Sequence, residues 1–263
     1  MVWQIRTKDA KRWYKGIALW LLRKEIYRFT QLQELAVLQH EVREGGRKMK
    51  NCILFSTTCA DKRLNNRVND WLNKHGKNRR IAVIPSYWQA TTREYPPYFA
   101  ARMGFEEYVI CPVGENFDKK RWSYAMQSDA CLLEGGNTFE FRAMLHLRGL
   151  DDDLRKFANR GILMGISAGS HIISPTVDLA SVADDNYLGL SGDELDGLGL
   201  TDFLVKPHAG MWLQYKELFR NYATKYNKPV YMIDEGQAVW VCDYGVKEYG
   251  GKVTKFFPYK DGA

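Results

Sequence analysis

The chain has 263 residues, of which 45% are hydrophobic and 26% charged, as in an ordinary globular protein. This composition excludes an intrinsically disordered chain, a collagen-like repeat and a small disulfide-bonded scaffold, and the length suits one large domain or two small ones. Lys and Arg number 38 against 31 Asp and Glu, so the net charge is +7.

The excess positive charge lies in residues 1–50, which hold 12 Lys and Arg against 5 Asp and Glu. Charges balance beyond residue 50, so there is no electrostatic reason to expect a nucleic acid partner. Apolar residues recur at helical spacing before the break at Gly45-Gly46. We expect a basic helical extension at 1–48, either packed on the domain or free for a membrane surface or a partner, and a globular domain at 49–263.

Five cysteines, an odd number, show no metal-site spacing, and free thiols in a reducing compartment are the simplest interpretation. The longest uncharged apolar stretch near the start, residues 16–22, is too short to span a membrane. We therefore expect a cytoplasmic protein without an integral membrane segment.

Short apolar runs alternate with amphipathic segments from residue 51 onward. The expected strands are 52–56, 81–85, 108–111, 130–134, 162–166, 203–205 and 230–233, and the expected helices are 61–75, 92–103, 117–126 and 139–148. This alternation predicts a mostly parallel sheet covered by helices on both faces, and residues 239–257 resemble an antiparallel hairpin that completes it. Ligands of such sheets bind at the carboxyl ends of the strands.

The most informative segment is Gly165-Ile166-Ser167-Ala168-Gly169, which follows an apolar strand. Gly-x-Ser-x-Gly between a strand and a helix is typical of a nucleophile elbow, whose crowded turn requires small residues on both sides of the serine. Ser167 is the predicted nucleophile, and the backbone N–H of Ala168 is a predicted oxyanion donor. The alternative is a glycine-rich helix start with a capping serine.

A serine nucleophile needs a base, most often a histidine, to take its proton. His208 is the preferred candidate because it follows a predicted strand and so lies at the same sheet edge as Ser167; the alternative is an ordinary hydrogen-bonded loop histidine. His171 lies only one helical turn after Ser167, too near in the chain to reach its hydroxyl in line. The remaining histidines lie in the extension or in helices: His40, His75 and His146.

A carboxylate must orient the imidazole and stabilise its cation. Two pairs compete, Asp184-Asp185 in a polar loop and Asp234-Glu235 at the end of a predicted strand. A strand end holds a carboxylate more firmly, which favours the second pair. Adjacent side chains point in different directions, so only one of the two is expected to serve.

A second strand, at 130–134, runs into the glycine-rich turn Gly135-Gly136. Glycines let the backbone approach a ligand closely, so an N–H of Gly135 or Gly136 is a predicted second oxyanion donor. Asn137 and Glu140 can form a capping box for the following helix. A phosphate site is the weaker alternative because the turn lacks the lysine of a P-loop.

Four motifs occur in this order: Gly135-Gly-Asn-Thr-Phe139, Gly165-Ile-Ser-Ala-Gly-Ser170, Lys206-Pro-His208 and Ile233-Asp-Glu-Gly-Gln-Ala238. Together they resemble the peptidase E family of serine hydrolases, which includes dipeptidase E and cyanophycinase. The resemblance implies a three-layer α/β sandwich of the flavodoxin-like, class I glutamine amidotransferase-like type. It also implies Ser167 as nucleophile, His208 as base and the loop at Gly135-Gly136 as oxyanion hole.

Members of that family differ in the third catalytic residue. Cyanophycinase-like proteins place a Glu in a run that matches Ile233-Asp234-Glu235, whereas dipeptidase E places an Asp where this chain has Val182. The resemblance therefore implies Glu235. Dipeptidase E also carries a substrate-binding Arg where this chain has Tyr222, with Arg220 nearby, so the resemblance does not extend to aspartyl specificity.

We predict a serine peptidase, an exopeptidase or dipeptidase, that hydrolyses short or unusual peptides through Ser167, His208 and Glu235. It requires no metal and no cofactor. The expected partner is a small peptide substrate, with a homodimer left open. Two alternatives also stay open: an α/β-hydrolase-type esterase that uses Ser167, Asp185 and His208, and a catalytically silent binding module that keeps the fold.

Overall fold

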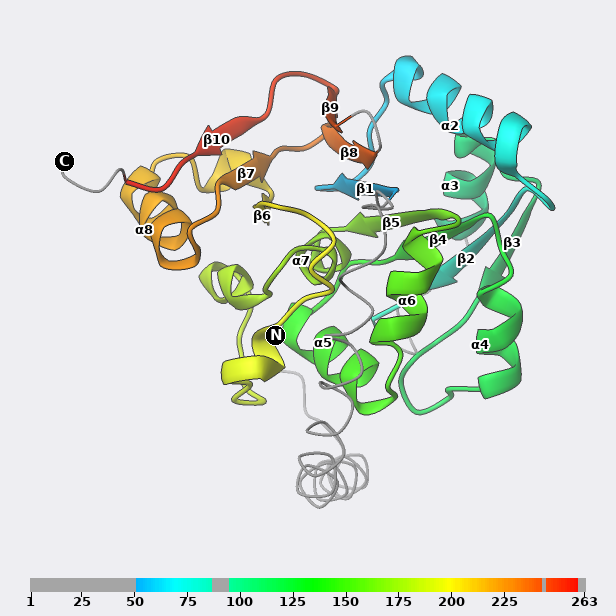
Figure 1. Ribbon diagram of the computed structural model, residues 1–263, viewed down its shortest axis with the longest axis horizontal. Coiled ribbons are helices and arrows are strands. Elements are labelled where there is room, and N and C mark those ends of the chain that lie inside the picture. Colours follow the sequence, from blue (N-terminus) through cyan, green and yellow to red (C-terminus); the bar gives the residue numbers. More distant parts are fainter. Residues whose placement is uncertain (1–50, 87–94, 243–244, 260–263) are drawn as a thin grey trace, which may run out of the picture. The chain divides into compact units, whose positions relative to one another are not determined.

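The computed structural model describes residues 51–86, 95–242 and 245–259. The extension predicted at 1–48 lies outside these residues, and so does the start, 92–94, of one predicted helix. The described part contains two β-sheets with helices packed around them (Figure 1).

The larger sheet has seven strands in the order β3-β2-β4-β5-β1-β8-β9. Its parallel strands are β1 (Cys52–Phe55), β2 (Arg80–Ile84), β3 (Glu107–Ile110), β4 (Ala130–Leu133) and β5 (Ile162–Ile166). β8 (Ala238–Cys242) runs antiparallel to β1, and β9 (Gly245–Tyr249) runs antiparallel to β8. The strands β1, β2, β4 and β5 are buried along their whole length, which is why they appear in the sequence as continuous apolar runs.

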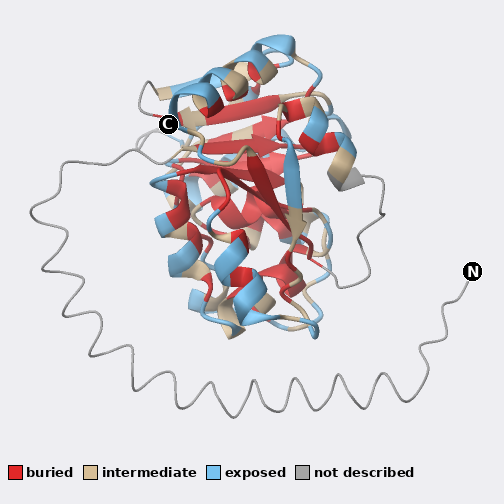
Figure 2. Cartoon of the chain, turned by 90° about the vertical axis from the view of Figure 1, so that its right-hand side faces the viewer, coloured by how far each residue is buried: buried red, intermediate tan, exposed pale blue. Residues whose placement is uncertain are grey.

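Helices cover both faces of this sheet (Figure 1). On one face lie α2 (Lys62–His75) and α3 (Tyr95–Met103), and on the other lie α4 (Lys119–Ala125), α5 (Thr138–Leu147), α6 (Asp151–Ala158) and α7 (Ala168–Ile173). α2 buries Leu64, Val68 and Leu72, which share one helical face, against the sheet. Figure 2 shows the buried strands between helices whose outer surfaces are exposed.

A second sheet has three strands in the order β10-β7-β6. β6 (Leu204–Pro207) and β7 (Val230–Ile233) are parallel, and β10 (Thr254–Phe256) runs antiparallel to β7. This sheet has its own apolar core, in which Phe219 of α8 (Lys216–Tyr226) packs with residues of all three strands. Short 3₁₀ helices complete the described elements: η1 (Asp178–Val182), η2 (Gly192–Leu195) and η3 (Ala209–Met211).

The predicted fold class is confirmed, since helices enclose a mostly parallel central sheet. Two details of the prediction are wrong. The strands predicted at 203–205 and 230–233 form the second sheet instead of joining the central one. Within 239–257 only β8 and β9 complete the central sheet, because β10 pairs with β7. A short apolar run predicts a buried strand, but it carries no information about which sheet the strand joins.

Strand direction brings the candidate site residues together. β1, β4 and β5 are parallel neighbours, so their carboxyl ends meet at one edge of the central sheet. β6 and β7 are parallel to each other, and the residues that follow them reach the same edge. Loops from five strands therefore supply the side chains described next.

Candidate active site

Ser167 lies in the sharp turn between β5 and α7, with φ 51° and ψ −109°. Such a positive φ is strained for a residue with a side chain, and the surrounding structure must hold it. The Ser167 N–H donates to the Phe55 carbonyl oxygen at 3.1 Å. A Cβ on Gly165 would lie 2.5 Å from the Gly169 carbonyl, and one on Gly169 would lie 2.1 Å from the Leu133 carbonyl oxygen. Both glycines of the motif are thus required by backbone packing.

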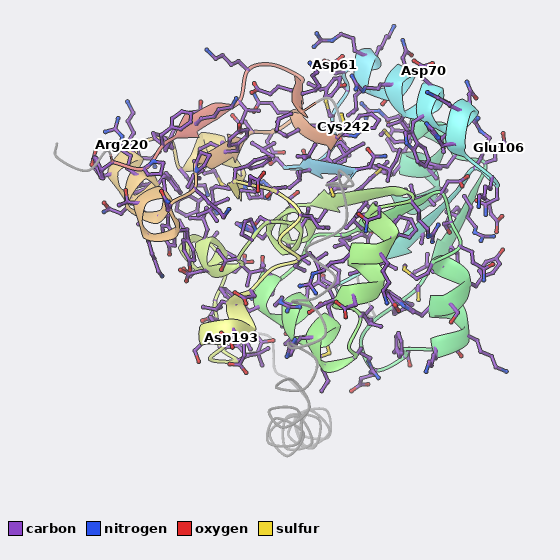
Figure 3. The ribbon with its side chains drawn as sticks, viewed as in Figure 1. Asp61, Asp70, Glu106, Asp193, Arg220 and Cys242 are labelled. Atoms are coloured by element: carbon purple, nitrogen blue, oxygen red, sulfur yellow. The ribbon has the colours of Figure 1, made fainter. Side chains whose placement is uncertain are left out.

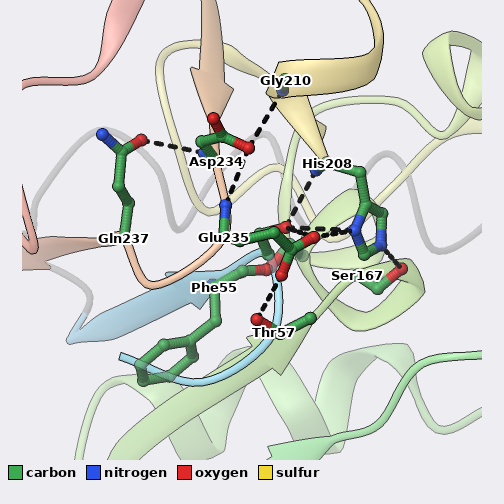
Figure 4. A network of polar contacts seen from close by, with 10 residues as sticks. Phe55, Thr57, Ser167, His208, Gly210, Asp234, Glu235 and Gln237 are labelled. Atoms are coloured by element: carbon green, nitrogen blue, oxygen red, sulfur yellow. Dashed lines mark hydrogen bonds and ion pairs between the residues drawn. The ribbon is translucent and has the colours of Figure 1, made fainter. Parts of the chain in front are cut away.

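The structure brings Ser167, His208 and Glu235 into one hydrogen-bonded chain (Figure 4). The Ser167 Oγ lies 3.0 Å from His208 Nε2, and His208 Nδ1 lies 2.6 Å from Glu235 Oε1. We assign the imidazole proton to Nδ1, because the carboxylate can only accept, so Nε2 is left to accept the serine proton. This is the arrangement that general-base activation of a hydroxyl requires.

Ser56 and Thr57 directly follow β1, and their hydroxyl groups hold His208 and Glu235 in place. Neither residue was predicted from the sequence to belong to the site. The Ser56 Oγ donates to Glu235 Oε1 at 3.1 Å and accepts from the His208 N–H at 2.9 Å. The Thr57 Oγ1 donates to Glu235 Oε2. The signal that could have identified these residues is their position directly after a buried strand that neighbours the elbow.

Asp234 and Glu235 point in different directions (Figure 4). Glu235 faces His208, whereas Asp234 Oδ1 accepts from the N–H groups of Gly210, at 3.0 Å, and Glu235, at 2.9 Å. The Asp234 N–H donates to Gln237 Oε1 at 2.8 Å. Asp234 therefore fixes the backbone at Gly210 and at Glu235, and among the described residues it makes no hydrogen bond to the imidazole.

The environment of Glu235 keeps its carboxyl ionised. Partial burial raises the pKa of this carboxyl, but its hydrogen bonds outweigh that effect and hold the pKa below its ordinary value. An ionised carboxylate keeps a proton on Nδ1 of His208 and stabilises the imidazolium that forms when His208 accepts a second proton.

The loop that carries two of the predicted oxyanion donors lies beside Ser167. A Cβ on Gly135 would lie 3.4 Å from the Ser167 Cβ and 3.9 Å from its Oγ, so the loop after β4 lies against the serine. Ser86 Oγ donates to the Gly135 carbonyl oxygen and anchors this loop. Within residues 51–86, 95–242 and 245–259, the N–H groups of Gly135, Gly136 and Ala168 donate no hydrogen bond. They are available to a ligand.

The two acids considered as alternatives, Asp184 and Asp185, contact a different part of the structure. Asp184 Oδ2 accepts from the Thr138 N–H at 2.9 Å, and the Asp185 carbonyl oxygen accepts from Asn137 Nδ2 at 2.9 Å. Both aspartates thus contact the amino end of α5, where Asn137 is the capping residue. Neither approaches His208 as Glu235 does.

The other described histidines do not contact the Ser167 hydroxyl. His171 is buried on α7, and burial holds the pKa of its imidazole well below the ordinary value, so it is neutral. His75 ends α2 beside Trp71, and His146 lies on α5 beside Asp151. His40 lies outside the described residues.

Arg220 and Tyr222 both belong to α8. Arg220 forms an ion pair with Glu217 at 2.9 Å on the exposed side of this helix, where Figure 3 labels it. The Tyr222 hydroxyl lies 3.0 Å from Ser181 Oγ. Neither side chain contacts Ser167, His208 or Glu235.

Three further features of the described residues bear on other classes of site. They contain no group of three or more His, Cys, Asp or Glu side chains placed to hold a metal ion. A pocket at the amino-terminal ends of β1 and β5 is lined by Asn51, Arg67 and Gly161 among others, and none of the three site residues lines it. No helix in this part of the chain combines the length and hydrophobicity that a membrane crossing requires.

Comparison with known proteins gives a family match. The family model of peptidase family S51 matches residues 52–249. The chain is 30% identical over 137 residues to peptidase E of Nostoc sp. (strain PCC 7120), a match that covers 49% of this chain and 52% of that protein. It is 28% identical over 118 residues to an uncharacterized peptidase of Listeria monocytogenes, covering 44% of this chain and 57% of that protein. The chain thus aligns with little more than half the length of these curated relatives.

Two solved structures share the fold. A Listeria monocytogenes protein assigned to peptidase E superposes with a TM-score of 0.54 at 22% identity, covering 76% of this chain and 98% of that one. A peptidase from an acI-B1 actinobacterium superposes with a TM-score of 0.55 at 15% identity, covering 81% and 96%. At these identities the likeness concerns the fold alone.

Proposed function

Because the chain belongs to peptidase family S51, we propose that it is a serine peptidase whose nucleophile, base and orienting acid are Ser167, His208 and Glu235. The observation that carries this proposal is the hydrogen-bonded chain from Ser167 Oγ through His208 to Glu235, with distances of 3.0 and 2.6 Å. The family match alone would not name these residues, and the geometry alone would not name peptides as substrates.

In the proposed reaction, Ser167 Oγ attacks the carbonyl carbon of a peptide bond while His208 Nε2 takes the hydroxyl proton. The negative charge that develops on the carbonyl oxygen is stabilised by the N–H of Ala168 and an N–H of the Gly135-Gly136 loop. His208 then gives its proton to the leaving amine, and the C–N bond breaks to leave an acyl-enzyme. Water, deprotonated by His208, releases the acid and restores Ser167.

We propose short peptides as the substrate class, and the assay is designed accordingly. A mixture of dipeptides with varied first residues is incubated with the enzyme and followed by mass spectrometry. We expect Ser167→Ala to lower kcat/KM about 10³-fold or more, in line with other serine triads. Ser123→Ala is the matched control, because Ser123 is an exposed serine on α4 whose hydroxyl donates to the Lys119 carbonyl oxygen.

The same assay tests the acid. We expect Glu235→Gln to lower kcat/KM about 10²-fold or more, because the amide cannot stabilise the imidazolium. Asp185→Asn should change it less than about twofold, since Asp185 contacts the α5 loop through its backbone. The opposite ranking would favour the esterase arrangement. Labelling of Ser167 by a fluorophosphonate probe distinguishes an active nucleophile from a silent binding module.

We also propose that the protein works in a reducing compartment, the cytoplasm. The support is that all five cysteines are free and buried.

A further inference from the structure

A cavity of about 450 Å³ lies at the amino-terminal ends of β1 and β5, whereas the candidate active site lies at their carboxyl ends. Gly161, directly before β5, lines this cavity, and Ser167 directly follows the same strand. The extended chain from Gly161 to Ser167 spans about 20 Å. The cavity is therefore separate from Ser167, and its volume is in the range of pockets that bind small organic molecules.

One side of α2 supplies most of the charged side chains around the cavity. Spacings of three and four residues place four lining residues on this side of the helix: Arg67, Asp70, Trp71 and Lys74. Figure 3 labels Asp70 on α2. A further cation, Arg160, lines the cavity from the loop between α6 and β5. Basic groups from two separate elements of the fold thus meet at one cavity.

The Arg, Lys and Asp side chains that line the cavity do not balance in charge. Arg67, Lys74 and Arg160 each carry a positive charge and Asp70 a negative one, so these four side chains have a net charge of +2. Among the residues that the structure describes, no carboxylate forms an ion pair with any of the three cations. An anion bound between them would offset their mutual repulsion.

Two of the cations are held in position by aromatic rings. The Arg67 guanidinium lies 5.2 Å from the centre of the Trp240 ring. The Arg160 guanidinium lies 4.5 Å from the centre of the Phe157 ring, and its Nη1 donates to the Ser128 carbonyl oxygen at 3.3 Å. A guanidinium has five N–H donors in a rigid fork, so these contacts leave donors for a ligand.

We propose that this cavity binds the phosphate group of a small phosphate monoester. Such a group carries nearly two negative charges above pH 7, which matches the net charge of the site, whereas a carboxylate supplies only one. Its oxygen atoms also suit the planar fork of a guanidinium. The half-buried ring of Trp71 offers the organic part of the ligand an apolar surface. The site is independent of the proposed peptidase reaction, because it lies at the other end of the strands.

The test is isothermal titration calorimetry of the full chain at pH 8 with phenyl phosphate, benzoate and phenol. We expect phenyl phosphate to bind with a Kd of about 1 mM or below, benzoate about 10-fold or more weakly, and phenol not at all. Lys74→Gln and Arg160→Gln are each expected to weaken phenyl phosphate binding about 10-fold, because each removes a charge-assisted interaction. Asp70→Asn should instead tighten binding about threefold, since it removes the negative charge at the site.

Lys156→Gln is the matched control, because Lys156 is an exposed lysine of α6 that does not line the cavity. It lowers the net charge of the protein equally and should change the Kd less than about twofold. The melting temperature without ligand checks that each variant is folded.

Ser167→Ala should bind phenyl phosphate as the wild-type protein does, so a failure of the proposed peptidase reaction leaves this measurement unchanged. Three results would overturn the inference. One is absence of phenyl phosphate binding at about 10 mM, and another is benzoate binding as tightly as phenyl phosphate. The third is a Kd that Lys74→Gln and Arg160→Gln leave unchanged, which would place the bound phosphate elsewhere on the protein.

Discussion

Glu134 makes the stability of the folded protein depend on pH. Burial raises the pKa of its carboxyl to about 7 from an ordinary value of 4.5. Between these values the folded protein holds a proton that the unfolded chain releases, so the free energy of unfolding falls as the pH rises through this range. Above pH 7 the ionised carboxylate costs the folded state on the order of 3 kcal/mol. We expect Glu134→Gln to recover most of this at pH 8 and nothing at pH 4, as measured by urea unfolding.

The control for that measurement is Glu115→Gln, since Glu115 is exposed. Its effect on the free energy of unfolding should be small at both pH values. If Glu134→Gln changed stability equally at pH 4 and pH 8, packing and not charge would be the cause, and the carboxyl would have an ordinary pKa.

The three residues of the proposed triad could be chosen from the sequence, whereas the residues that hold them in position could not. Ser167, His208 and Glu235 each stand just after a predicted strand, in motifs that suggest a chemical role. Ser56 is the last residue of a predicted strand, but a hydroxyl residue there is common, and its contact with His208 joins residues 152 positions apart. This contact can be identified only when the arrangement of the two sheets in the folded protein is known.

The elbow depends on how closely β4, β5 and α7 approach each other. A Cβ on Gly169 would lie 2.1 Å from the Leu133 carbonyl oxygen, a backbone atom that cannot move without distorting β4. We expect Gly169→Ala to lower the free energy of unfolding by about 3 kcal/mol. Gly189→Ala is the control, because Gly189 has φ +64° with no atom within 4 Å of its Cβ position, so only backbone strain of about 1 kcal/mol is expected. Equal losses for the two variants, measured by urea unfolding, would contradict close packing as the reason for the motif.

Most central elements follow from apolar patterning, but sheet membership does not. β1, β2, β4 and β5 are covered on both faces, so their sequences are continuous apolar runs that mark them as strands. β6 and β7 have the same kind of sequence because they too are buried, with Val230 packed among residues of the second core. Their assignment to a separate sheet depends on β10 and α8, which supply that core.

The proposed triad is assembled from both sheets. Ser167 follows β5 of the central sheet, whereas His208 and Glu235 follow β6 and β7 of the second sheet. Ser56, at the end of β1, joins them by accepting from the His208 N–H and donating to Glu235. The distance between the nucleophile and its base is therefore set by how the second sheet is held against the first, and each sheet has its own apolar core.

This division predicts that the second sheet can lose its structure while the central sheet keeps its own. Phe219 is fully buried among the residues of the second core, and Phe219→Ala is expected to destabilise that core by about 3 to 5 kcal/mol. Amide hydrogens of β6 and β7 should then exchange with solvent faster, while those of β1 and β5 keep their protection, and hydrolysis should fall as His208 and Glu235 lose their positions. Leu64→Ala, in the central core, should instead reduce protection around α2. If Phe219→Ala reduced protection equally in both sheets, the two sheets would unfold as one cooperative unit. His208 could then be displaced from Ser167 only by unfolding both sheets.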